Sequence, residues 1–174
     1  VLAFAEVSIP ALKARVTDLT QTLTISQKNE LETLLANFEA RKGSQIAVLM
    51  IQSTEGESIE EYALRIVESW KLGRRSIDDG ALLLIAKEDR AMRIEVGYGL
   101  EGALSDIVSK RIIAETITPY FKQGNFFGGL DAGVRQMMSV IDGELLPASQ
   151  AQKSTKSSKE ISRFRTNKLG LFAI

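Results

Sequence analysis

Apolar and polar residues alternate along most of the chain with the periods of helices and strands. Thr24 and Gln27 match a capping box, and apolar residues then recur every three or four positions, which predicts a helix over 24–43. A second apolar stripe at helical spacing predicts a helix over 57–73. Between these helices, residues 45–52 form a continuous apolar run with β-branched side chains, as expected of a strand buried on both faces.

The second half of the chain adds two strands and two helices. Residues 81–86 are another apolar run, and residues 92–96 alternate with period two after a short turn, so we expect an antiparallel hairpin. Helical patterns follow at 104–117, where the helix is expected to stop before Pro119, and at 130–145. This order of elements predicts an α/β domain with a small mixed sheet covered by helices.

The composition removes much of the common enzyme chemistry. The chain has 174 residues and contains neither cysteine nor histidine. A Ser-His-Asp or Cys-His nucleophile, a disulfide framework and a zinc site of thiolates or imidazoles are therefore excluded. Carboxylates, hydroxyls, amides and backbone carbonyls remain, and these ligands suit a hard cation such as calcium, magnesium or manganese.

The formal net charge of zero hides an uneven distribution. Residues 1–147 hold 16 basic and 21 acidic side chains, whereas residues 148–174 hold six basic side chains and one acidic side chain. The acidic body opposes a nucleic-acid-binding role. The basic segment is rich in Ser, Thr and Gln, which predicts a tail outside the packed core.

Both ends of the sequence resemble the flanks of an exported, membrane-anchored protein. Residues 1–6 contain an apolar run with an Ala-x-Ala pattern, which indicates a signal-peptide remnant or, alternatively, an ordinary N-terminal extension. Residues 169–174 are apolar and follow the basic tail, as at the edge of a membrane helix. We therefore expect a folded domain over 7–147 and a tail over 148–174 that leads toward a membrane anchor, in a periplasmic or other extracytoplasmic location.

The segment from Gly97 to Gly102 contains the spacing G-x-G-x-x-G after a predicted strand. A dinucleotide site would need a βαβ unit and an acidic residue about 20 positions further on. That region, 117–122, holds no carboxylate, and Glu101 would repel a pyrophosphate. We therefore predict no nucleotide site.

The same glycine-rich segment favours a carboxylate site instead. The hairpin brings residues 80 and 97 together at its open end, so the loops on either side supply oxygen ligands to one end of the sheet. These ligands are Asp78, Asp79, Glu101 and Asp106. Their chemistry suits Ca²⁺ or Mg²⁺. Alternatively, the two adjacent aspartates are ordinary turn residues, and Asp106 favours the N-terminus of its helix.

Several segments together resemble the TPM domain family. They are Val16-Thr17-Asp18, the helix start at Leu23-Thr24, Gln45 to Ile51, Trp70 to Gly73, Asp79 to Leu84 and Arg93 to Glu101. The resemblance covers residues 7–147 and is most specific from Asp78 to Asp106. It implies a three-layer α/β/α sandwich with a small mixed β-sheet, a signal peptide and often a membrane helix after the domain, as in bacterial secreted or anchored proteins of the YgcG type.

The resemblance implies more than one activity. A plant thylakoid-lumen member associated with photosystem II repair is assigned acid phosphatase activity, an animal member is an auxiliary subunit of an acetylcholine receptor, and some members bind divalent cations in acidic loops. The positions here that match those acidic loops are Asp18, Asp78, Asp79, Glu101 and Asp106.

Two functions are therefore expected, and we favour the first. It is an exported, membrane-anchored accessory domain that binds calcium and docks onto an unidentified membrane protein, without catalytic residues of its own. The alternative is a metal-dependent acid phosphatase, in which a cation polarises a phosphoryl oxygen of a phosphomonoester and an aspartate assists. The sequence carries no motif for a phosphoenzyme and no histidine acid, which weighs against the alternative.

Overall fold

The fold was analysed in a computed structural model, which describes residues 6–143 and residue 146. Nearly all of the predicted signal remnant and the whole basic tail lie outside the described residues. Among the described helices, none combines the length and the apolar character needed to cross a bilayer.

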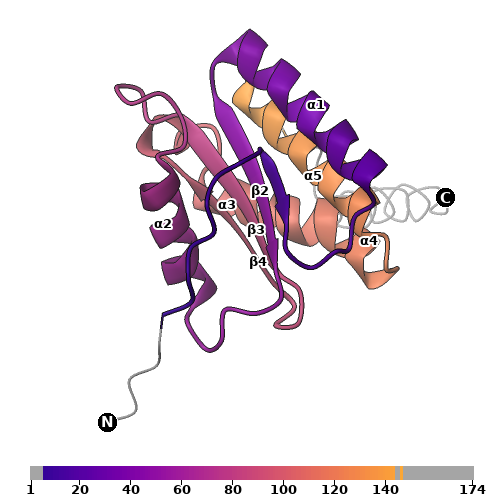
Figure 1. The fold of residues 1–174 in the computed structure, drawn as a ribbon. Helices are drawn as coiled ribbons and strands as arrows, with labels where there is room; N and C mark the ends of the chain where they lie inside the picture. Colours follow the sequence, from indigo (N-terminus) through magenta and orange to yellow (C-terminus); the bar gives the residue numbers. More distant parts are fainter. Residues whose placement is uncertain (1–5, 144–145, 147–174) are drawn as a thin grey trace, which may run out of the picture.

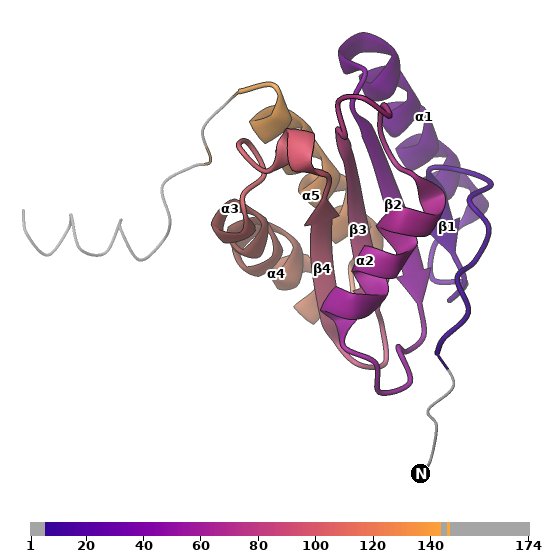
Figure 2. The ribbon, with the colours of Figure 1, turned by 90° about the vertical axis from the view of Figure 1, so that its left-hand side faces the viewer.

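The structure is built on a four-stranded mixed sheet in the order β1-β2-β3-β4 (Figure 2). The strands are β1 (Val16–Asp18), β2 (Gln45–Ile51), β3 (Gly80–Ala86) and β4 (Ala91–Val96). The first three strands are parallel, and β4 pairs antiparallel with β3 as the predicted hairpin. The α/β fold class with a small mixed sheet is confirmed.

The two central strands bury both of their faces. All seven residues of β3, and all but Gln45 in β2, are buried. Alternate side chains of β2 belong to different hydrophobic clusters because successive side chains of a strand point to opposite faces. One cluster contains Ile46, Val48 and Met50, and the other contains Ala47, Leu49 and Ile51.

Helices cover the sheet on both sides and complete the three layers (Figure 1). The helices α1 (Ile25–Lys42) and α5 (Phe126–Ile141) pack on one face. On the other face, α2 (Ile59–Trp70) is joined by the N-terminal segment 7–12. The indole Nε1 of Trp70 donates to the carbonyl oxygen of Pro10 at 2.7 Å and fixes this segment against α2.

The predicted helix over 104–117 is wrong in its bounds. A 3-10 turn η1 (Tyr98–Leu100) comes first, and the helix that follows consists of α3 (Asp106–Arg111), a π-helical turn η2 (Ile112–Ile117) and α4 (Thr118–Lys122). It therefore continues through Pro119. Because the amide of Thr118 donates to the carbonyl of Ile113, five residues back, the backbone is already widened before the proline. Pro119 also occupies the first turn of α4, where its missing N–H costs little.

One short strand and the start of the last helix also differ from the prediction. The three-residue strand β1 was not predicted from the periodicity, because three residues are too few to show a period. The last helix begins at Phe126 instead of about 130, because the side chain of Asn125 caps it by accepting from the amide of Gly128 at 2.9 Å. The capping box of Thr24 and Gln27 is confirmed, with both side chains bonded to the other residue's amide.

We predict that Gly73→Ala destabilises the domain more than Gly56→Ala. Both glycines have positive φ, +87° and +93°. A Cβ at Gly73 would lie 2.3 Å from the amide nitrogen of Gly80, whereas a Cβ at Gly56 meets nothing within 4 Å. Urea unfolding should show a loss of about 1 kcal/mol for Gly56→Ala and at least about 2 kcal/mol for Gly73→Ala. Equal losses would contradict the packing described for the start of β3.

Candidate functional site at the carboxyl-terminal edge of the sheet

The loops after β1, β2 and β3 meet at one edge of the sheet, where their polar side chains are connected. Asp18 is the last residue of β1. Its Oδ1 accepts from the amide of Thr20 at 2.8 Å, and its Oδ2 accepts from the amide of Leu23 at 2.8 Å. The carboxylate therefore holds the loop that leads from β1 into α1.

A chain of hydrogen bonds runs from Lys87, after β3, to Asp18. The ammonium of Lys87 donates to Thr22 Oγ1 at 3.0 Å, the hydroxyls of Thr22 and Thr20 are 2.6 Å apart, and Thr20 donates to Asp18 Oδ1 at 2.6 Å. An ammonium only donates and an ionised carboxylate only accepts, so both hydroxyl protons point toward Asp18. The network thus has a cationic end at Lys87 and an anionic end at Asp18.

Asp89, in the turn between β3 and β4, holds the loop after β2 in the same way. Its Oδ1 accepts from the hydroxyl of Ser53 at 2.8 Å. Its Oδ2 accepts from the amide of Thr54 at 2.8 Å and from the Thr54 hydroxyl at 3.2 Å. Both oxygens of Asp18 and both oxygens of Asp89 are thus used within the fold.

These hydrogen bonds keep both carboxylates ionised. For Asp18, burial acts to raise the pKa, but the hydroxyl of Thr20 and the loop amides outweigh it and lower the pKa below the usual value of 3.8. For Asp89, the amide of Thr54, followed by the Ser53 hydroxyl, lowers the pKa. Neither group is poised to exchange a proton near neutral pH.

The sequence prediction placed its carboxylates around Asp78 and Asp79, which lie at the opposite edge, before β3. Asp79 is buried, with a side chain 3% exposed. It accepts from the amide of Arg74 at 2.8 Å and from the Nε of the same residue at 2.9 Å. Burial acts to raise its pKa, but the bonds from Arg74 outweigh it and lower the pKa. Asp79 therefore anchors the loop from α2 to β3.

Asp78 joins this loop to the glycine-rich segment, as the hairpin register predicted. The amide of Gly97 donates to the carbonyl of Gly80 at 2.8 Å, which confirms that residues 80 and 97 meet. The carboxylate of Asp78 accepts from the amide of Tyr98 at 2.8 Å. A Cβ at Gly97 would lie 2.3 Å from the Asp78 carbonyl oxygen, so this close approach requires glycine.

Glu101 and Asp106 lie on a shallow groove beside β4, together with Arg93. Asp106 is the first residue of α3 and pairs with Lys110 at 2.8 Å and with Arg93 at 3.3 Å. Arg93 also pairs with Glu95 at 2.9 Å. A guanidinium thus stands among the groove's carboxylates, where it opposes a bound cation.

The five predicted ligands do not share one site. Asp18 pairs with Met50 in the sheet, whereas the carbonyl of Asp79 accepts from the amide of Gln45. Gln45 and Met50 are five positions apart along β2, or about 16 Å at about 3.3 Å per residue. Within the part of the chain that the structure describes, no three carboxylates gather as a group that could hold a metal ion. Binding of Ca²⁺ or Mg²⁺ stays a prediction, but a single centre of all five residues does not fit the fold.

The groups that the structure connects at the carboxyl-terminal edge were missed from the sequence. Apart from Asp18, they are Thr20, Thr22, Ser53, Thr54, Lys87 and Asp89. Their common signal is that they follow the carboxyl ends of strands, where open α/β sheets bind ligands. Without β1 in the predicted order of elements, the loop after Asp18 was not assigned to this edge.

Comparison with known proteins identifies the fold and its family. The sequence model of the TPM domain matches residues 16–140. The chain belongs to the TPM domain family. No curated protein matches the chain significantly.

Solved structures share this fold. The solution NMR structure of the N-terminal domain of a protein from P. gingivalis is 32% identical, with a TM-score of 0.69 over 74% of this chain and 82% of that chain. The BA42 protein from the psychrophilic bacterium Bizionia argentinensis is 21% identical, with a TM-score of 0.62 over 75% of this chain and 94% of that chain. The N-terminal domain of the cg2496 protein from Corynebacterium glutamicum is 15% identical, with a TM-score of 0.57 over 84% of this chain and 93% of that chain.

The lowered pKa values of Asp18 and Asp79 make the free energy of unfolding depend on pH in the acidic range. A carboxyl whose folded pKa lies below its unfolded value of 3.8 stabilises the folded state fully above about pH 4, and this contribution is lost as the pH falls through the folded pKa. Asp79→Asn should therefore lower the free energy of unfolding at neutral pH by about 1–3 kcal/mol. Its difference from the wild type should shrink below pH 4 in urea unfolding. A difference that is constant across this pH range would contradict the role given to the Asp79 carboxylate.

Proposed function

We propose that this TPM domain is a binding domain of an exported, membrane-anchored protein, and that it contacts a membrane partner through the carboxyl-terminal edge of its sheet. The observation that carries the proposal is that the carboxylates at that edge are already occupied in holding the loops. Both oxygens of Asp18 and of Asp89 accept hydrogen bonds from their own or neighbouring loops. Because these oxygens are already hydrogen-bonded, neither carboxylate is free to act as a nucleophile or a proton acceptor without breaking those bonds.

Apolar side chains beside the polar network support a protein contact. Leu19, directly after Asp18, is 54% exposed, and Ile25, the first residue of α1, is 80% exposed. A contact surface typically combines exposed apolar groups with a polar rim. Here the segment that follows β1 supplies both the exposed apolar side chains and part of the polar network. Docking on this edge would bury the two side chains without any change in the fold.

A metal-dependent phosphatase is the second candidate, because the matching family model is named for a phosphatase. In such an enzyme a cation would polarise a phosphoryl oxygen and an aspartate would act beside it. Asp18 is the best-placed aspartate, since it ends β1 near hydroxyls and Lys87. Its oxygens would first have to give up their loop hydrogen bonds, and for this reason we prefer the binding role.

Export and anchoring are parts of the proposal that rest on the sequence. The Ala-x-Ala pattern lies in residues 1–5, and the basic tail with its apolar end lies in residues 148–174. These segments are outside the described residues. In this arrangement the folded domain would stand beside the membrane that holds its partner.

Site-specific photo-crosslinking tests the proposed contact. A photoreactive amino acid in place of Ile25 should give a crosslinked membrane protein in membranes that contain the full-length chain. The same amino acid in place of Leu64 is the matched control, because Leu64 is 49% exposed but lies on α2. The proposal predicts an adduct from position 25 that is absent from position 64. Equal adducts at both positions, or an adduct from position 64 alone, would overturn it.

A further inference from the structure

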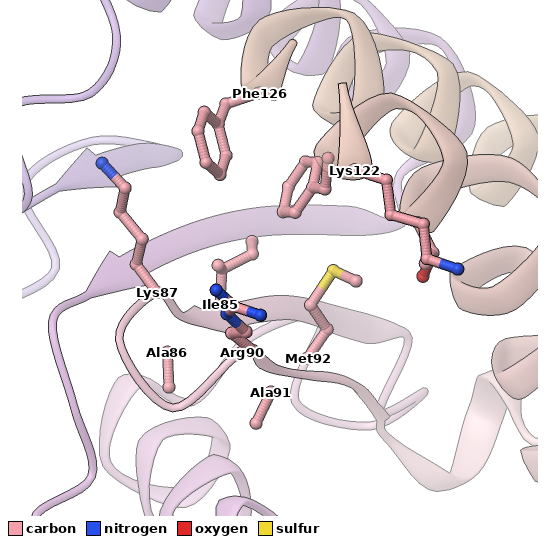
Figure 3. A pocket seen from close by; sticks show the side chains of 10 residues that line it. Ile85, Ala86, Lys87, Arg90, Ala91, Met92, Lys122 and Phe126 are labelled. Carbon is pink, nitrogen blue, oxygen red and sulfur yellow. The ribbon is translucent and has the colours of Figure 1, made fainter. Parts of the chain in front are cut away.

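A second feature of the domain is a pocket of about 550 Å³ between the β3–β4 turn and the junction of α4 with α5 (Figure 3). Ile85 and Met92 contribute from neighbouring positions of β3 and β4, which pair at this point of the sheet. Phe121 and Phe126 contribute from the helices, with ring centroids 4.9 Å apart and planes tilted by 58°. The pocket therefore has an apolar interior that the fold builds from four separate elements.

The charged side chains that line the pocket are cationic. Lys87, Arg90 and Lys122 line the pocket, and no carboxylate is found among the described residues that do so. Figure 3 shows Lys87 and Lys122 on opposite sides, with Arg90 between them. This is unusual in a body that carries 16 basic and 21 acidic side chains over residues 1–147. Three cations beside an apolar interior raise the local concentration of anions.

The fold holds two sources of positive potential in place at the pocket, namely the ammonium of Lys87 and the N-terminus of α5. The ammonium of Lys87 donates to Thr22 and lies 4.9 Å from the centroid of the Phe126 ring, as in a cation–π contact. In addition, α5 begins at Phe126, so the positive end of its backbone dipole lies at the same wall. Arg90 and Lys122 are exposed and can close onto a bound group.

We propose that this pocket binds a small organic acid, whose aromatic or branched apolar body packs against Ile85, Met92 and the phenylalanine pair and whose carboxylate is attracted by the three cations that line the pocket. The volume falls in the range of sites for small organic ligands, about 300–1,000 Å³. A diacyl lipid would exceed it. The proposal is independent of the protein contact described above, because neither Leu19 nor Ile25 lines the pocket.

An NMR titration of the full chain with three probes tests the ligand class. Naphthoate combines an apolar body with a carboxylate, naphthalene methanol keeps the body without the charge, and inorganic phosphate keeps a charge without the body. Naphthoate should shift the methyl signals of Ile85 and Met92 and the amide of Phe126 in a saturable way. The other two probes should bind at least about fivefold more weakly, because each lacks one of the two contributions.

Variants separate this site from general attraction of anions to basic residues. Arg90→Gln and Lys122→Gln should each weaken naphthoate binding about three- to tenfold. Arg75→Gln is the matched control, since Arg75 is an exposed cation before β3 at the other edge of the sheet, and it should leave the affinity unchanged. The proposal is overturned if the alcohol or phosphate binds as tightly as naphthoate, if the shifts lie outside the pocket, or if all three variants behave alike.

Discussion

Burial of both faces of β2 and β3 is the constraint that organises this domain. Each strand has apolar side chains pointing to both sides of the sheet, and neither face can be left in water. The helices α1 and α5 cover one face, whereas α2 covers the other with help from segment 7–12. Parallel strands need long crossover connections. The crossover helices α1 and α2 therefore also serve to cover the two faces. The three-layer arrangement follows from this requirement.

The direction of the strands then divides the loops between two edges with different roles. The edge that precedes β3 carries Asp78 and Asp79, whose carboxylates fasten the loop from α2 to neighbouring backbone and to Arg74. The other edge collects the loops after β1, β2 and β3, together with the polar network from Lys87 to Asp18. Carboxylates thus hold the loops at both edges, and the second edge differs in joining loops from three strands through one network.

The long periodic segments could be predicted from sequence because each repeats its pattern over several turns or residues. This holds for α1, α2, the buried strands and the hairpin, whose register correctly joined residues 80 and 97. The three residues of β1 show no period, and the π-turn before Pro119 depends on a single widened hydrogen bond. Without β1, the carboxylate of Asp18 could not be assigned to the edge opposite Asp79. The hairpin grouped Asp78 and Asp79 with the glycine-rich segment, and Asp18 joined the predicted ligands only through the family resemblance.

We propose that this TPM domain binds a partner and does not catalyse a reaction. The most direct measurement is the hydrolysis of para-nitrophenyl phosphate by the purified full chain, from mildly acidic to neutral pH, with and without Ca²⁺ or Mg²⁺. For a binding domain we expect a rate equal to that of protein-free buffer under every condition. This expectation would be contradicted by metal-dependent turnover that Asp18→Asn abolishes in a folded variant and that Asp131→Asn, a change in a surface ion pair of α5, leaves intact.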